Sequence, residues 1–264
     1  MAVGEVVGGR YRVVGGPPGR GRVAFAEEVG SGRPVVVEFP DGAPGPGVRL
    51  RHPGIVAVLE TGVHEGRPFL VMERLDGHSL EDHLLDGWYR PHEVAGFGAQ
   101  VAEALLVAHR AGLSHGALAA DRLLLTPDGT VKVLGFGTPV PVPRPDLVAL
   151  GDTLLELLGQ PLIPSFRPEP GELDALIEEL RAVPDDPPDP AVTAAFAARL
   201  RRLHRLHRLA AAAPSAAAAP PERPVRRARR IVRHPGRRTA ALALLLLSGA
   251  ALLAVAAYAA AAGF

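Results

Sequence analysis

Few side chains in this sequence could carry out catalysis. Cysteine is absent, which excludes a thiol nucleophile, a disulfide and cysteine-ligated zinc. Lys132 is the single lysine and there is no asparagine. His204 and His207 stand three apart in RRLHRLHRL, but two imidazoles among arginines, without a carboxylate or third ligand, are a poor cation site. We therefore expect no metal there, and we expect the solvated face of a terminal helix whose apolar residues pack inward: Leu200, Leu203 and Leu206.

The predicted secondary structure that must position these residues changes from strands to helices near residue 78. Short apolar–polar alternations between turn clusters predict an antiparallel sheet over residues 10–77, with HEGR at 64–67 as a hairpin turn. After Ser79 the apolar residues follow the helical period, with Pro91 near the start of the first helix and Gly112 at its end. Further helices are predicted over residues 146–158, 171–183 and 191–209.

Between Ser114 and Gly137 the sequence SHGALAADRLLLTPDGTVKVLGFG predicts a loop and a hairpin, because PDG is strong turn chemistry between two β-rich runs. This stretch and three earlier ones together resemble bacterial serine/threonine protein kinases over residues 9–209. The three earlier stretches are GRYRVVGGPPGRGRVAFAEEV, RPVVVEF and RLRHPGIVAVLETGVHEGRPFLVMERLDGHSLEDHL. The resemblance implies an α+β, bilobal protein-kinase-like fold. A small antiparallel sheet lobe spans 9–77, and a reduced, mainly helical lobe spans 78–209.

The same resemblance assigns the catalytic positions, and their residues have changed. Glu38 stands for the lysine of the third strand, Ala117 for the catalytic-loop aspartate and Ala119 for the lysine two positions later. Arg122 and Gly135 stand for the asparagine and aspartate that hold metal. Phosphoryl transfer depends on placed positive charge, and a carboxylate near a triphosphate is repulsive. The resemblance therefore implies a domain without catalysis by the ordinary route.

No shift of the alignment restores these groups, because Lys132 lies far from the sheet lobe in sequence and asparagine is absent. Lys132 is expected to be an exposed, solvated side chain. PDGAPGPGVR is too short for the family's regulatory helix, and TPVPVPRP replaces the activation and peptide-docking loops. His115 and Phe136 match spine positions, and Asp146 is expected to cap backbone amides near Gly116. Other positions match a residual adenine pocket: Val23, Val36, Met72, Leu75 and Leu124.

A membrane anchor is predicted at the C-terminal end. The segment from Ala240 to Gly263 has no charge and, as a helix, exceeds the ~30 Å hydrocarbon thickness. Eight arginines between Arg223 and Arg238 flank one side, which predicts that this side is cytoplasmic and that the C-terminus lies outside. An Ala/Pro linker (210–222) and a basic juxtamembrane segment (223–239) precede the span. The N-terminus has no apolar run typical of a signal peptide.

Charge separates the anchor region from the rest. Without the eight arginines the chain has 29 − 8 = 21 basic and 28 acidic residues, a balance of 21 − 28 = −7. This excludes a nucleic-acid partner for the main body, whereas the basic segment suits anionic lipid. Small residues in the span suggest a homodimer, namely Ser248, Gly249, Ala250 and Ala254.

These observations favour a membrane-anchored pseudokinase in the cytoplasmic membrane that regulates or scaffolds protein partners in signalling or envelope assembly. No cofactor is expected. Two alternatives remain open. One is a serine/threonine kinase with an atypical site, in which Asp121, Asp128 or Glu38 holds a metal. The other is a sensor that binds nucleotide weakly, without magnesium and without transfer.

Overall fold

The computed structural model describes most of the first 212 residues. Its described ranges are 1–17, 21–84, 89–138, 140, 143–159, 171–184 and 189–212. They belong to one compact unit, Met1–Pro214. The predicted basic segment and transmembrane helix lie outside the described residues. Among the helices that are described, none has the length and apolarity needed to cross a bilayer.

The sheet lobe is antiparallel, as the alternating pattern predicted. Its strands are β1 (Val6–Val7), β2 (Tyr11–Gly15), β3 (Val23–Glu28), β4 (Pro34–Glu38), β5 (Val58–His64) and β6 (Arg67–Glu73). They pair in the order β1-β2-β3-β4-β6-β5. Alternate side chains point to one face and form a small core with Tyr11, Phe39 and Phe69.

The predicted hairpin at 64–67 is confirmed. His64 pairs with Arg67, and the two residues between them, Glu65 and Gly66, have φ of 50° and 76°. Positive φ at both central positions is the signature of a two-residue turn whose twist matches the strands. Between β4 and β5, where the resemblance places a regulatory helix, the chain forms one short 3-10 helix, η1 (Pro46–Arg49).

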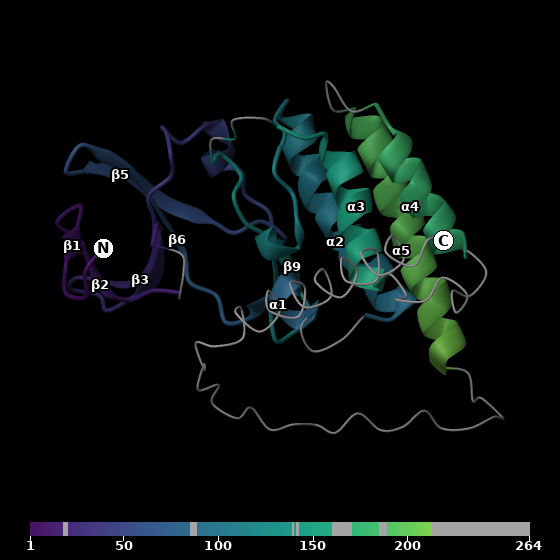
Figure 1. The fold of residues 1–264 in the computed structure, drawn as a ribbon, viewed down its shortest axis with the longest axis horizontal. Helices are drawn as coiled ribbons and strands as arrows, with labels where there is room; N and C mark the ends of the chain where they lie inside the picture. The colour runs from purple at the N-terminus through teal and green to yellow at the C-terminus, as the bar shows by residue number, and fades with distance from the viewer. Residues whose placement is uncertain are drawn as a thin grey trace, which may run out of the picture. The chain divides into compact units, whose positions relative to one another are not determined.

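The second lobe is built on α2 (Pro91–Arg110), which packs against α3 and α5. Gly112 ends this helix in the left-handed region, with φ of 70°. The other helices are α1 (Leu80–Leu84), α3 (Asp146–Leu158), α4 (Glu172–Ala182) and α5 (Pro190–Ala212) (Figure 1). The predicted helices are confirmed, and α5 runs past its predicted end at Leu209.

A small sheet joins the two lobes. It contains β7 (His78–Ser79), β8 (Leu123–Leu125) and β9 (Val131–Val133), in the order β7-β8-β9. A single 3-10 turn, η2 (Ala120–Arg122), leads into β8. The predicted hairpin around PDG is therefore confirmed, and it places the loop before β8 and the loop after β9 side by side.

Candidate functional site

A cavity of about 520 Å³ lies between the sheet lobe and the β7-β8-β9 sheet. Glu38 and Val23 line it from the sheet lobe, and Ala117, Arg122 and Gly135 line it from the loops around β8 and β9. The chain therefore brings together four of the five positions that the sequence singled out as degenerate. The fifth, Ala119, is exposed just before η2.

Four charged residues line this cavity, and their signs balance. Arg22 forms an ion pair with Asp41, so one of the two cavity arginines already faces a carboxylate. Arg122 Nε lies 3.8 Å from Asp121 Oδ2. Glu38 adds a further carboxylate to the wall. In the part of the chain that the structure describes, no three acidic or histidine side chains gather as metal ligands.

Asp146, at the start of α3, holds the loop beneath the cavity. Its carboxylate accepts hydrogen bonds from the backbone N–H of His115 and of Gly116, both at 2.8 Å, and lies 2.9 Å from His109 Nε2. Burial alone would raise the pKa of Asp146, but the hydrogen bonds from His109, His115 and Gly116 outweigh it and lower the pKa. The predicted cap is confirmed.

His115 is buried and packs edge-on against Phe136, with 4.8 Å between ring centroids. Its Nε2 lies 2.7 Å from Leu134 O and its Nδ1 accepts from Ala117 N at 3.2 Å. The imidazole therefore carries its proton on Nε2 and uses Nδ1 as an acceptor. Burial lowers the pKa of His115, which keeps the ring neutral.

The loop after β9 is held by backbone contacts with the η1 segment. Gly45 N donates to Gly137 O at 2.7 Å. A Cβ on Gly47 would lie 2.5 Å from Gly137 N, so only glycine fits this approach. Two segments that are far apart in sequence thus meet where the resemblance places the regulatory helix.

Comparison with known proteins agrees with this architecture. Residues 48–145 match the family model described as protein tyrosine and serine/threonine kinase. The crystal structure of the Mycobacterium tuberculosis PknI kinase domain superposes with a TM-score of 0.62 at 24% identity, covering 77% of this chain and 99% of that one. This chain has a protein-kinase fold.

Part of this chain is also similar in sequence to curated bacterial protein kinases. The serine/threonine-protein kinase PknL of Mycobacterium tuberculosis is 39% identical over 90 residues, covering 34% of this chain and 23% of PknL. A probable serine/threonine-protein kinase of Streptomyces coelicolor is 33% identical over 152 residues, covering 50% of this chain and 23% of the relative. The chain thus spans less than a quarter of either relative, and over the matched residues it is similar to bacterial serine/threonine protein kinases.

The residues matched to an adenine pocket separate into two groups in this kinase fold. Val36 and Met72 are partners across β4 and β6, and they pack in one apolar cluster with Leu75. Val23 lines the cavity instead, and Leu124 is a half-buried residue of β8. The kinase-like hinge region therefore keeps an apolar cluster at the base of the sheet lobe.

Lys132 does not have the exposed position predicted for it. Its Nζ lies 2.7 Å from Glu73 Oε1, and the two side chains are only 18% and 24% exposed. The same Glu73 oxygen accepts from Ala57 N at 2.9 Å. The prediction was wrong because the partner lies 59 positions away in sequence, and only the fold brings β9 to the end of β6.

The histidines of α5 also differ from their prediction. Leu200 and Leu203 are buried as predicted, at 0% and 2% exposure, but Leu206 is 45% exposed. His204 is half-buried, and its Nδ1 donates to His92 O at 2.7 Å. This imidazole takes part in the packing of α5 against the start of α2, so it is not on a solvated face.

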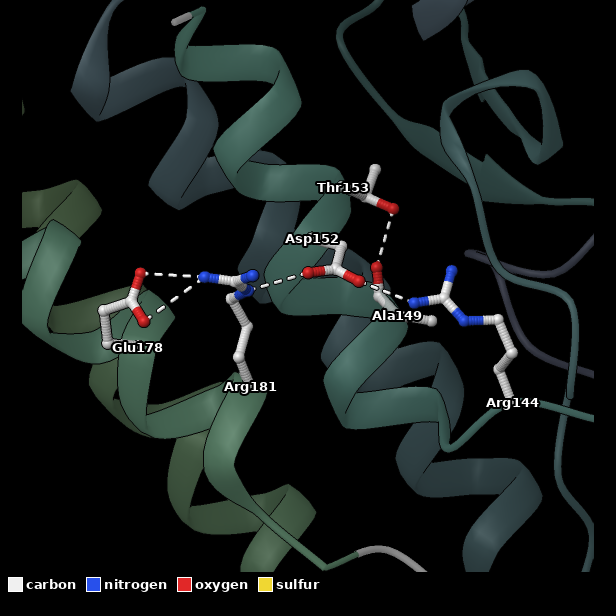
Figure 2. Close-up of polar contacts among 6 residues, drawn as sticks. All are labelled: Arg144, Ala149, Asp152, Thr153, Glu178 and Arg181. Atoms are coloured by element: carbon white, nitrogen blue, oxygen red, sulfur yellow. Dashed lines mark hydrogen bonds and ion pairs between the residues drawn. The ribbon is translucent and has the colours of Figure 1, made fainter. Parts of the chain in front are cut away.

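A polar network ties the shortened loop before α3 to α4 (Figure 2). Asp152 on α3 accepts from Arg144 Nη2 at 2.6 Å and from Arg181 Nε at 2.7 Å. Arg181 also pairs with Glu178. Burial alone would raise the pKa of Asp152, but the bonds from both arginines lower it. Figure 2 shows the carboxylate between the two guanidinium groups, a bridge that sequence reasoning missed.

Proposed function

We propose that this chain is a membrane-anchored pseudokinase that regulates or scaffolds other proteins through its kinase-like domain. The observation that carries the proposal is the composition of the cavity wall. Glu38, Ala117, Arg122 and Gly135 line the space where the resemblance places phosphate and metal. Neither Ala117 nor Gly135 has a side chain that can accept a proton or bind magnesium, so the two aspartate roles that the resemblance assigns to these positions are not filled there.

Electrostatics support the same proposal. A bound triphosphate would face the carboxylates of Glu38 and Asp41. Of the two cavity arginines, Arg22 is engaged by Asp41, and Arg122 lies 3.8 Å from Asp121. Two like charges inside a cavity of low effective dielectric repel each other with a free energy of whole kilocalories per mole rather than tenths of one. The packing beside the cavity is retained by contrast, since Asp146 caps the loop and His115 packs on Phe136. Retention of the frame without the phosphate groups favours a role in binding.

The strongest alternative is a kinase with an atypical site, and the names of the relatives favour it. The structure argues against one of its suggested metal ligands. Asp128 Oδ1 accepts from Thr126 Oγ1 and Thr130 N within the hairpin turn, and these hydrogen bonds lower the pKa of Asp128. This carboxylate already serves the turn, and Asp128 lines another hollow, beside Lys132.

A transfer assay separates the two functions. The full-length chain in detergent is incubated with radiolabelled ATP, magnesium and generic protein substrates, beside a heat-inactivated sample. We expect equal label in both samples. Incorporation above the inactivated control would refute the pseudokinase proposal.

A thermal-shift titration tests the nucleotide-sensor alternative. We expect ATP and ADP to leave the melting temperature of the full-length chain unchanged, with or without magnesium. Glu38→Lys should gain a shift with ATP, because it replaces a repulsive carboxylate with a cation that can contact phosphate. A magnesium-independent shift of the unmodified chain would support the sensor.

The remaining parts of the proposal concern location and partners. Residues 240–263 serve as a single span, with the kinase-like domain cytoplasmic and the C-terminus outside, and the arginines from Arg223 to Arg238 contact anionic lipid. The small residues of the span support a homodimer. Crosslinking of the full-length chain in membranes, followed by identification of the captured proteins, tests for partners in signalling or envelope assembly. If the chain is crosslinked only to lipid or to a second copy of itself, and no other protein is captured, the result would argue against the scaffold.

A further inference from the structure

The last turns of α5 expose a face that combines leucine with arginine. Leu206 and Leu209 are 45% and 70% exposed, which sets them apart from the buried Leu200 and Leu203 of the same helix. Arg202, Arg205 and Arg208 are also exposed. In Figure 1 the C-terminal end of α5 extends past the ends of α3 and α4. We name these five exposed residues the α5 face: Arg202, Arg205, Leu206, Arg208 and Leu209.

Helical geometry places these residues on one side of the helix. Leu206 and Leu209 follow Arg202 by four and seven positions, and residues at this spacing lie on one face. The opposite side is committed to the domain, where Leu203 is buried and His204 donates to His92 O. The α5 face is therefore an amphipathic surface that the domain does not use.

The arginines of this face carry charge that their neighbours do not neutralise. Arg199 and Arg201, which come just before Arg202 in the same helix, pair with Glu179 and Glu103. No acidic partner is found for Arg202, Arg205 or Arg208 among the described residues. The sequence of α5 contains no aspartate or glutamate. The exposed end of the helix is consequently positive beside exposed leucine.

We propose that the α5 face docks the kinase-like domain onto the anionic surface of the membrane. Leucine that inserts at the boundary of the acyl chains, flanked by arginine at the headgroups, is the pattern of an interfacial helix. Each arginine near an anionic surface contributes roughly fivefold to binding. This proposal rests on the proposed membrane anchor, because an anchor in the same chain keeps lipid at high effective concentration.

Anionic lipid fits this surface better than a protein partner because the charge and the continuity of the chain agree. The sequence that follows α5 has eight more arginines before the apolar segment begins, and all of these charges have the same sign. A face for a second copy of the chain would bring these like charges together, which is unfavourable. A bilayer with negative headgroups instead attracts both regions.

The absence of cysteine allows a direct test. Leu206→Cys, and separately Leu209→Cys, is labelled with an environment-sensitive fluorophore in the full-length chain. The chain is reconstituted into vesicles of phosphatidylcholine alone or of phosphatidylcholine with phosphatidylserine. Val63→Cys, on an exposed strand residue of the other lobe, is the control position. We expect a blue-shifted, brighter emission at 206 and 209 only with phosphatidylserine, and no change at 63.

Charge variants complete the test. Arg205→Glu with Arg208→Glu should lower the ratio of docked to undocked domain by more than roughly 25-fold and abolish the shift, because two attractive charges are lost and two repulsive charges are added. Arg12→Glu with Arg33→Glu removes the same charge from exposed positions of the sheet lobe and should leave the shift intact. Docking to anionic lipid would be overturned by the absence of a fluorescence shift or by a shift of equal size in neutral vesicles. A shift that depends on the number of chains per vesicle would also overturn it.

The anchor is measured separately in the same samples. Flotation with vesicles of phosphatidylcholine alone reports on the proposed span, because neutral lipid does not attract the α5 face by charge. A chain that floats without any fluorescence shift would refute docking and leave the anchor in place. A chain that fails to float would refute the anchor, and its shift on added phosphatidylserine vesicles would still decide the docking.

Discussion

His115 is held in its neutral form by two backbone groups. Protonation of Nδ1 would set a new N–H against the N–H of Ala117, which now donates to that nitrogen at 3.2 Å. It would also place a charge in a buried site, so burial is the main reason that the pKa of His115 is lowered from 6.5. A residue that belongs to the packing frame of a kinase fold thereby becomes sensitive to acid.

The consequence is a loss of stability on the acid side of pH 6.5, the ordinary histidine value. Below this pH the His115 imidazole takes up a proton in the unfolded chain but not in the folded chain. The contribution of His115 to stability is therefore full above this pH and falls as pH decreases. The slope is at most about 1.4 kcal/mol per pH unit for one proton. Chemical denaturation at several pH values, for the unmodified chain and His115→Gln, measures it.

We expect the stability advantage of the unmodified chain over His115→Gln to shrink as pH falls below that value. Glutamine keeps a polar side chain without titrating in this range. If the two curves of unfolding free energy against pH run parallel, His115 does not contribute the acid sensitivity.

At the scale of elements, two connections are held by contacts between segments that are distant in sequence. The η1 segment, where the resemblance places a regulatory helix, contacts the loop after β9 through Gly45 and Gly47. Arg144, just before α3, is bonded to Asp152. Both segments are tied down by direct bonds, and this suits a domain that presents a constant surface.

The contact between Gly47 and Gly137 can be tested with two neighbouring substitutions. Gly47→Ala places a methyl group 2.5 Å from a backbone nitrogen, so the segments must move apart. We expect a loss of about 1–3 kcal/mol in the free energy of unfolding, as for other overpacked sites. Gly45→Ala is the control, because its Cβ would meet Gly137 O at an ordinary 3.6 Å. Equal losses in both variants would contradict this explanation.

The Lys132–Glu73 pair links β9 to the end of β6, so it braces the region between the lobes. A double-mutant cycle with Lys132→Met and Glu73→Gln isolates the pair from other effects of each substitution. We expect a coupling free energy of about 1 kcal/mol, near the upper end for exposed pairs, because both side chains are mostly buried. A coupling free energy indistinguishable from zero would show that the pair does not brace the region between the lobes.

At the scale of the whole molecule, charge and apolarity are divided between two ends. The main body is acidic and carries the kinase fold, whereas the basic and apolar segments follow it. Such a division suits a domain that is kept beside a membrane by its own chain. The proposed scaffolding function requires that the domain stays near the membrane and presents a binding surface, and it requires no catalytic turnover.

Membrane extraction tests this division. We expect the full-length chain to stay with membranes through washes in high salt and in alkaline carbonate, and to be released by detergent. Salt screens the attraction of arginine for lipid but does not weaken an inserted apolar helix. Replacement of Leu244, Leu246 and Leu252 by Arg should abolish retention. Release of the unmodified chain by salt alone would mean that it is held only by surface charge.

The sequence by itself determined the order of strands and helices in the described part of the chain, and through the resemblance to kinases it predicted which catalytic positions have changed. Alternation, helical period and turn residues are local signals, so Asp146–Leu158 and the hairpin at 64–67 were predictable. That asparagine is absent and that Lys132 is the single lysine is a matter of composition and needs no structure. The cap by Asp146 followed from the resemblance to kinases.

Only the tertiary structure decided which distant residues meet. Lys132 finds Glu73, Asp152 joins two arginines and Gly47 lies against Gly137 because segments far apart in sequence are folded onto one another. Leu206 has the helical spacing of a core residue, yet it is exposed. Periodicity defines a face of a helix, but where the neighbouring helices end decides how much of that face is covered.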